Sequence, residues 1–168
     1  MELIYVQPDK CLGCRSCEIA CRVAHSKDKN LVAAVSQSSP PQRRLFVEQQ
    51  GGRTMPVLCR HCDDAPCVAA CITGCLYKND RGFVLRHKER CIGCWSCILA
   101  CPFGVISRNA EQHLAVKCDR CHKKDVPACA AACPTKALRI VDVDELPKER
   151  RRDVALKNEP VPLFVVPT

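Results

Sequence analysis

Sixteen of the seventeen cysteines in this 168-residue chain fall into four motifs of four. In the first and third motifs, three cysteines stand three residues apart and a fourth follows four residues later. The second and fourth motifs keep this order but lengthen the middle gap, and proline follows the last cysteine of the third and fourth motifs. In chain order, the motifs are Cys11, Cys14, Cys17 and Cys21; Cys59, Cys62, Cys67 and Cys71; Cys91, Cys94, Cys97 and Cys101; and Cys118, Cys121, Cys129 and Cys133.

This spacing is the ligand pattern of bacterial [4Fe-4S] clusters. A short loop can deliver three thiolates to three iron atoms of a cluster, but the fourth thiolate must come from elsewhere in the chain. In two-cluster ferredoxins, the last cysteine of each motif ligates the other cluster. Proline after that cysteine, as in Cys101-Pro102 and Cys133-Pro134, turns the chain away from the cluster. The sequence therefore predicts four [4Fe-4S] clusters, bound by motifs that exchange their fourth ligands in pairs.

Structural zinc and disulfides are the alternative explanations for so many cysteines. Zinc ribbons use paired Cys-x2-Cys units, which leave the third cysteine, the fourth cysteine and the following proline unexplained. Disulfides require an oxidising compartment, whereas Cys11 follows Met1 too closely for a signal peptide, and no apolar segment is long enough to span a membrane. We therefore expect a soluble, cytoplasmic iron–sulfur protein. Co-export with a signal-bearing partner stays open, and a zinc-stapled interaction protein is the alternative from another class.

The formal net charge of +8 suggests an acidic partner or nucleic acid at first sight. Sixteen thiolates around four oxidised clusters add roughly −8, or about −2 per cluster, so the loaded protein is expected to be near neutral. The basic residues are therefore interpreted as compensation for the clusters and not as a nucleic-acid surface. Aromatic residues make up only 4% of the chain, so the clusters are expected to supply core volume and to be required for folding.

Short β-rich segments and short helical turns alternate with the motifs. Helical turns are expected over residues 18–24, 68–72 and 127–133, where they present the last cysteines of three motifs. A polar loop is expected over residues 26–42, which contain Pro40-Pro41, and a charged helix over residues 144–158. The strands are expected at residues 3–6, 44–48, 54–58, 82–85, 114–117 and 138–141, with turns at 50–52 and 78–81.

The four motifs together resemble the four-cluster ferredoxin-like electron-transfer subunits of anaerobic oxidoreductases, over about residues 3–143. In that family, the first motif pairs with the fourth and the second with the third. The resemblance implies four ligand quartets, each named here after the motif that supplies three of its thiolates. The first quartet is Cys11, Cys14, Cys17 and Cys133; the second is Cys59, Cys62, Cys67 and Cys101; the third is Cys91, Cys94, Cys97 and Cys71; and the fourth is Cys118, Cys121, Cys129 and Cys21.

The resemblance also implies an α+β fold: a duplicated bacterial-ferredoxin-like fold of two modules, each with two [4Fe-4S] clusters, short strands, short helices and long cluster-binding loops. The outer module comprises residues 1–26 and 110–143, with motifs one and four, and the inner module comprises residues 56–109, with motifs two and three. Residues 27–55 form a loop and hairpin insertion. Residues 144–168 hold the charged segment and an apolar tail, which is expected to cover its own fold or to dock a partner.

Within the family, the chain looks most like the iron–sulfur subunit of anaerobic carbon monoxide dehydrogenase. The features that carry this likeness are Ala24-His25-Ser26, the second motif with Asp63-Asp64-Ala65-Pro66, and the short length. The implied function is to relay single electrons from carbon monoxide dehydrogenase to a hydrogenase, a flavin NAD(P) reductase or a ferredoxin. The alternative is the same role beside a formate dehydrogenase or a hydrogenase. No motif replaces a cysteine with a non-ligand, so no substrate site and no enzymatic activity of its own are expected.

Several side chains near the motifs carry separate expectations. Cys75 lies outside every motif and is expected to be a buried free thiol, with a redox role as the alternative. His61 is expected to donate toward a cluster sulfur or a partner. Trp95 is expected to pack against its cluster and limit access of water. Ile72 departs from the family, where proline is common at that position. The remaining histidines, His25, His87, His113 and His122, are expected at the surface.

Overall fold

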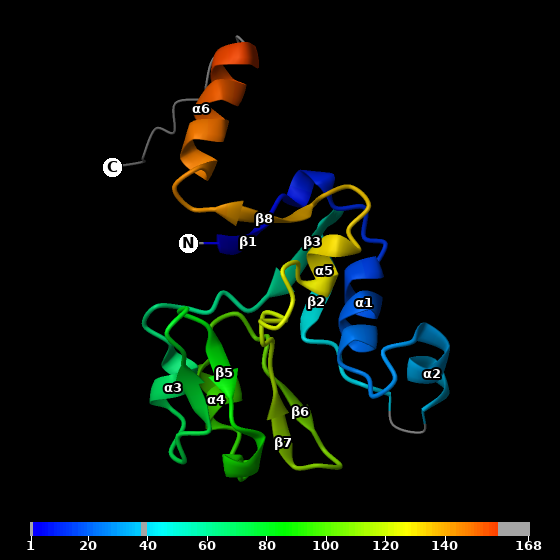
Figure 1. Cartoon of the computed structure of the whole chain (residues 1–168), viewed down its shortest axis with the longest axis vertical. Helices are drawn as coiled ribbons and strands as arrows, with labels where there is room; N and C mark the ends of the chain where they lie inside the picture. Colours follow the sequence, from blue (N-terminus) through cyan, green and yellow to red (C-terminus); the bar gives the residue numbers. More distant parts are fainter. Residues whose placement is uncertain (1, 38–39, 158–168) are drawn as a thin grey trace.

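The computed structural model describes residues 2–37 and 40–157, a mixed arrangement of short strands and short helices (Figure 1). The strands are β1 (Glu2–Val6), β2 (Leu45–Gln50), β3 (Arg53–Leu58), β4 (Leu76–Lys78), β5 (Val84–Arg86), β6 (Ser107–Asn109), β7 (Leu114–Val116) and β8 (Leu138–Asp142). The helices are α1 (Ser16–Ala24), α2 (Leu31–Ser36), α3 (Pro66–Ala69), α4 (Ser96–Ala100), α5 (Ala128–Ala131) and α6 (Leu146–Lys157), with 3-10 turns η1 (Pro8–Lys10) and η2 (Lys88–Arg90).

The first and fourth motifs lie together although they stand at opposite ends of the cysteine-rich region. Strand β1 pairs antiparallel with β8, so that Glu2 faces Asp142. Helix α1, which carries Cys17 and Cys21, packs against α5, which carries Cys129. Apolar side chains and cysteines of both motifs form one buried core, in which Leu138 is 1% exposed. The first and fourth motifs are therefore held together by one sheet and one helix pair.

The second and third motifs repeat this arrangement. Strand β4 pairs antiparallel with β5, and α3 contacts α4. A second buried core joins Cys67 of motif two to Cys97 of motif three, together with Val84 and Ile106. Figure 1 shows this group below the first one, with the β6–β7 hairpin beside it. Each core thus combines cysteines of two motifs, and the two cores share none of them.

The β2–β3 hairpin packs on the core of the first and fourth motifs, called here the outer core. Leu45, Val47 and Leu58 belong to the outer core, and the Val47 N–H donates to Glu18 Oε1 on α1 at 2.7 Å. The hairpin was expected within one or two residues of its actual bounds, with its turn at Gly51 and Gly52. It is therefore part of the support of the first and fourth motifs.

Three local features differ from the expectations. Part of the expected loop at residues 26–42 forms helix α2, because the Asn30 side chain caps it by accepting from the Val32 N–H. Strand β4 begins in a segment for which no strand was expected. The β6–β7 hairpin crosses residue 109, where the inner module was expected to end. Ala115 on β7 packs in the core of the second and third motifs, called here the inner core.

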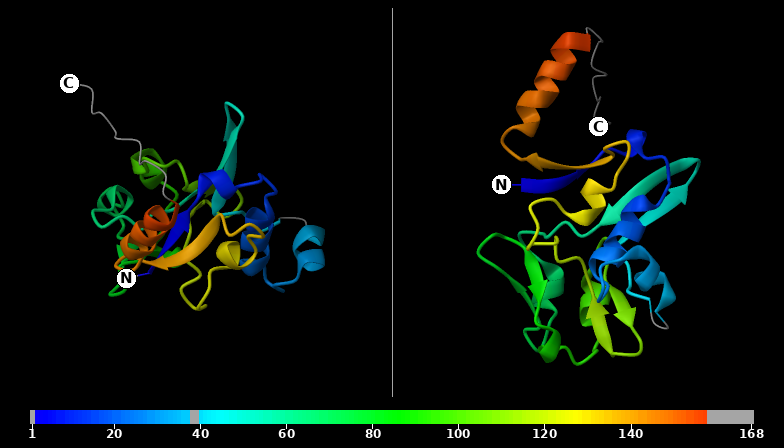
Figure 2. Two further views of the ribbon diagram at one scale, coloured as in Figure 1. Left: turned by 90° about the horizontal axis from the view of Figure 1, so that it is seen from above. Right: turned by 45° about the vertical axis from the view of Figure 1, so that its right-hand side comes forward.

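Helix α6 follows β8 and stands away from the two cores (Figure 1, Figure 2). Arg139 on β8 forms an ion pair with Glu149 at 2.9 Å, and Arg150 lies over the Tyr5 ring, so these contacts anchor the base of the helix. The expected charged helix is confirmed. The apolar tail at residues 160–167 lies outside the described residues. In the part of the chain that the structure describes, every helix is too short or too polar to cross a bilayer.

Candidate iron–sulfur sites

Left-handed residues shape the loops of the first and third motifs in the same way. Gly13 and Gly93 both have a φ of 69°, and the helices that follow start after left-handed Arg15 and Trp95. These turns reverse the chain between successive cysteines. Glycine is required at 93 because a Cβ there would lie 2.7 Å from the His113 carbonyl oxygen. The loops are therefore shaped by the same two conformations at equivalent positions.

The second and fourth motifs share a different loop shape. A left-handed residue stands between their first two cysteines, His61 with a φ of 49° and Arg120 with a φ of 63°. The backbone N–H of each donates to the preceding motif cysteine, to Cys59 Sγ at 3.5 Å and to Cys118 Sγ at 3.3 Å. Each core therefore combines one loop of the first kind with one of the second kind.

Two cavities are lined by complete cysteine quartets. Four thiols line the first cavity, and four others line the second. In each cavity, three cysteines come from one motif and the fourth is the last cysteine of another motif. The lining cysteines are Cys11, Cys14, Cys17 and Cys133 in the first cavity, and Cys59, Cys62, Cys67 and Cys101 in the second.

The cysteines of the other two quartets lie close enough to affect each other's ionisation. The pKa of Cys97 is raised to about 11, mainly because the thiol is buried and then because of the charges of Cys71 and Cys91. The pKa of Cys129 is likewise raised to about 12, mainly by burial and then by the charge of Cys21. Thiols that disfavour each other's ionisation at close range form a site that needs a cationic centre to hold them as thiolates. The donor sets therefore fit iron–sulfur clusters.

Backbone amides also point at the cysteine sulfur atoms. The Leu76 N–H donates to Cys71 Sγ and the Leu138 N–H donates to Cys133 Sγ, both at 3.4 Å and both five residues after the cysteine. Such hydrogen bonds stabilise a thiolate and tune the potential of a bound cluster. The equivalent position of the two bonds shows that the same local structure follows motifs two and four.

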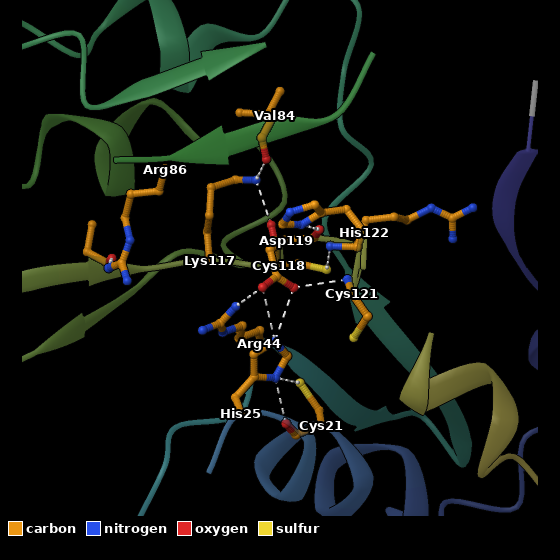
Figure 3. Close-up of polar contacts among 12 residues, drawn as sticks. Cys21, His25, Arg44, Val84, Arg86, Lys117, Cys118, Asp119, Cys121 and His122 are labelled. Carbon is orange, nitrogen blue, oxygen red and sulfur yellow. Dashed lines mark hydrogen bonds and ion pairs between the residues drawn. The ribbon is translucent and has the colours of Figure 1, made fainter. Parts of the chain in front are cut away.

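A charged network surrounds the fourth motif (Figure 3). His25 Nδ1 lies 2.7 Å from the Cys21 carbonyl oxygen, and His25 Nε2 lies 3.1 Å from Asp119 Oδ1. Arg44 Nη1 donates to Asp119 Oδ2 at 2.7 Å, and the Cys121 N–H donates to Asp119 Oδ1 at 3.0 Å. Burial opposes ionisation of Asp119, but His25 and Arg44 hold the pKa of this carboxyl well below its usual range.

The expectation that His25 is a surface histidine is wrong. Its imidazole is largely buried, and its partner Asp119 stands in a distant motif. Sequence reasoning missed Asp119, Arg44 and Lys117, because no local pattern marks residues whose partners are remote in the chain. The only signal was that Asp119 and Lys117 lie next to Cys118.

The other single-residue expectations have mixed outcomes. Cys75 is buried as expected, 2% exposed, and its thiol donates to the His87 carbonyl at 3.1 Å. His61 is 8% exposed, and its Nδ1 accepts from the Val84 N–H at 3.1 Å. Its Nε2 has no hydrogen-bond partner among the described residues. Trp95 is partly buried beneath Arg108, whose guanidinium carbon lies 5.8 Å from the ring. The role expected for His61 toward a cluster stays a prediction.

Comparison with known proteins places these motifs among related chains. Residues 52–143 match the model of the 4Fe-4S dicluster domain. An "Iron-sulfur protein" of Rhodospirillum rubrum is 41% identical over 91% of this chain and 90% of its own. The "Electron transport protein HydN" of Escherichia coli K12 is 39% identical over 91% of this chain and 97% of its own. The "Thiosulfate reductase electron transfer subunit PhsB" of Salmonella typhi is 36% identical over 81% of this chain and 73% of its own.

Proposed function

This chain belongs to the 4Fe-4S dicluster domain family of electron-transfer proteins, and we propose that it is a four-cluster electron-transfer subunit of an oxidoreductase complex. The observation that carries the proposal is the pair of cavities lined by complete cysteine quartets. When bound, [4Fe-4S] clusters supply one-electron redox chemistry. The sixteen motif cysteines would hold them in the four quartets defined above, within a duplicated ferredoxin-like fold.

Electrostatic interactions between quartets support an arrangement in one row. In three pairs of cysteines from different quartets, the charge of one thiolate adds to the rise in the pKa of the other, after the larger effect of burial. These pairs link the first quartet to the fourth, the fourth to the second, and the second to the third. They are Cys17 with Cys129, Cys59 with Cys118, and Cys67 with Cys97.

The ends of this row reach the surface. Cys14 of the first quartet and Cys94 of the third are exposed, whereas the cysteines of the second and fourth quartets are buried or partly buried. Leu12 and Ile92, at equivalent positions beside these two cysteines, are exposed as well. We propose that one electron enters from a reduced partner at one of these ends while one leaves to an oxidised partner at the other.

The chain itself is proposed to have no substrate site, because thiolates occupy all four iron atoms of each cluster. The catalytic partner that we favour is carbon monoxide dehydrogenase, on the resemblance of Ala24-His25-Ser26 and of the second motif to its iron–sulfur subunit. The electrons would pass to a hydrogenase, a flavin NAD(P) reductase or a ferredoxin. A formate dehydrogenase or a hydrogenase is the second candidate for the catalytic partner.

The test is anaerobic purification of the native complex, with iron, sulfide and zinc measured and co-purifying subunits identified by mass spectrometry. We expect about sixteen iron and about sixteen sulfide per chain, and a nickel–iron carbon monoxide dehydrogenase. A molybdenum or tungsten enzyme in its place would move the partner to the second candidate. Zinc in place of iron would end the proposal.

Matched cysteine variants sharpen this test. Replacing Cys14 with Ser removes a proposed ligand and should lower the number of reducible clusters. Replacing the buried non-motif Cys75 with Ala should leave four clusters. Equal iron content in the two variants would contradict the ligand assignment.

A further inference from the structure

Two buried cations lie where the two modules meet. Lys117 is 4% exposed, and its Nζ donates to the Val84 carbonyl at 2.6 Å and to the Cys118 carbonyl at 2.8 Å (Figure 3). It therefore connects β5 of the inner module to the fourth motif. Arg120 is 5% exposed, and its Nη2 donates to the Glu2 carbonyl at 3.0 Å. Both side chains are held in place by backbone carbonyl groups.

These cations need negative charge that carbonyl groups do not supply. A buried charge is costly unless an opposite charge lies close to it. In the described part of the chain, the side-chain hydrogen bonds of Lys117 and Arg120 are to carbonyl oxygens, and Arg120 Nη1 has no hydrogen-bond partner. The adjacent carboxylate of Asp119 is engaged with His25 and Arg44.

Both residues lie beside cysteines of the two central quartets. Lys117 precedes Cys118 in the chain and donates to its carbonyl, and Val84, which accepts the other hydrogen bond of Lys117, lines the cavity of the second quartet. The backbone N–H of Arg120 donates to Cys118 Sγ at 3.3 Å. Lys117 therefore lies between the second and fourth quartets, and Arg120 lies at the fourth.

We propose that Lys117 and Arg120 form a cationic bridge between the two central clusters of the row and raise the reduction potentials of these clusters. The inference rests on the proposed function. A fixed positive charge favours the reduced, more negative form of a cluster. Lys117 favours an electron on either side of the junction between the modules, whereas Arg120 favours one on the fourth quartet.

The test is redox titration of the anaerobically purified chain, followed by electron paramagnetic resonance. The Lys117→Gln variant keeps amide donors for the two carbonyls and removes the charge, and Arg120→Gln removes the second charge. Lys148→Gln is the matched control, because Lys148 lies on α6 and pairs with Glu145. The Cys14→Ser and Cys94→Ser variants identify the signals of the two terminal quartets.

We expect Lys117→Gln to lower two of the four reduction potentials by about 59 mV each. This shift is about a tenfold decrease in the equilibrium constant for one-electron reduction. These two signals should be the ones that Cys14→Ser and Cys94→Ser leave unaltered. Arg120→Gln should lower one of them, and Lys148→Gln none. Unchanged potentials, or a change at the terminal quartets or at all four, would overturn the bridge.

Two further outcomes are distinguishable. If Lys117→Gln fails to assemble its clusters, Arg120→Gln decides alone: a fall in a single central potential supports the bridge, and its absence overturns it. Failure of the proposed function appears earlier, because the unaltered chain would then lack four reducible clusters.

Discussion

His25 Nε2 lies 3.1 Å from Asp119 Oδ1, although 94 residues separate the two in the chain. This contact joins the end of α1 to the loop of the fourth motif, and Arg44 completes it from the start of the β2–β3 hairpin. Cys21 and Cys121, which flank the contact, belong to the same proposed quartet. The ion pair therefore holds together the two segments that must supply that quartet.

Replacing Asp119 with Asn is expected to weaken the fourth quartet. The change leaves the positive groups of His25 and Arg44 without their shared carboxylate, at a cost of about 2 kcal/mol. Iron release to a chelator should become faster, with about a quarter of the iron leaving first. The matched control is Asp63→Asn, because Asp63 is exposed and pairs with Lys78 at the surface. Equal release rates in the two variants would contradict the role of Asp119.

Replacing Gly93 with Ala is expected to destabilise the third quartet. Alanine at a φ of 69° carries a conformational cost of about 1 kcal/mol. Its Cβ would also meet the His113 carbonyl oxygen at 2.7 Å, and this backbone atom cannot move freely. Gly51→Ala is the control, because Gly51 has a φ of 57° and open space around it. Loss of iron from Gly93→Ala but not from Gly51→Ala is expected, and full iron content in both would exclude the steric argument.

Cys75 is expected to resist alkylation in the native protein. Burial, followed by the charges of Cys91 and Cys71, raises the pKa of this thiol to about 12. The thiol therefore stays protonated at pH 8, and the thiolate that reacts with iodoacetamide is absent. Mass spectrometry should find Cys75 modified only after unfolding. Rapid modification of the folded, iron-loaded chain would show a redox-accessible thiol.

Removal of iron is expected to abolish cooperative unfolding. Cysteines of two motifs contribute to each of the two buried cores, so the cores lose their central contacts without bound metal. Calorimetry should show a transition for the loaded chain and none after anaerobic treatment with a chelator. A cooperative transition in the iron-free chain would disprove this dependence.

Local patterns predicted much of the secondary structure but little of the charged network. The β-rich residues around Val47 and Leu138 and the helical turn at Cys21 lie where expected, because their periodicity is local. Helix α2 was missed because its stability rests on a cap at Asn30 within a polar segment. The burial of Lys117 was not predicted, because burial of a cation becomes visible only when Val84 and Cys118 are placed around it.

The pairing of β1 with β8 has a consequence for synthesis of the chain on the ribosome. Glu2 is translated 140 residues before its partner Asp142. The inner pairing of β4 with β5 joins nearby residues and becomes available much sooner. Until β8 emerges, a nascent chain carries the thiols of the first motif without their partner strand. The inner cysteines can therefore be sheltered first, while Cys11, Cys14, Cys17 and Cys21 await the synthesis of β8.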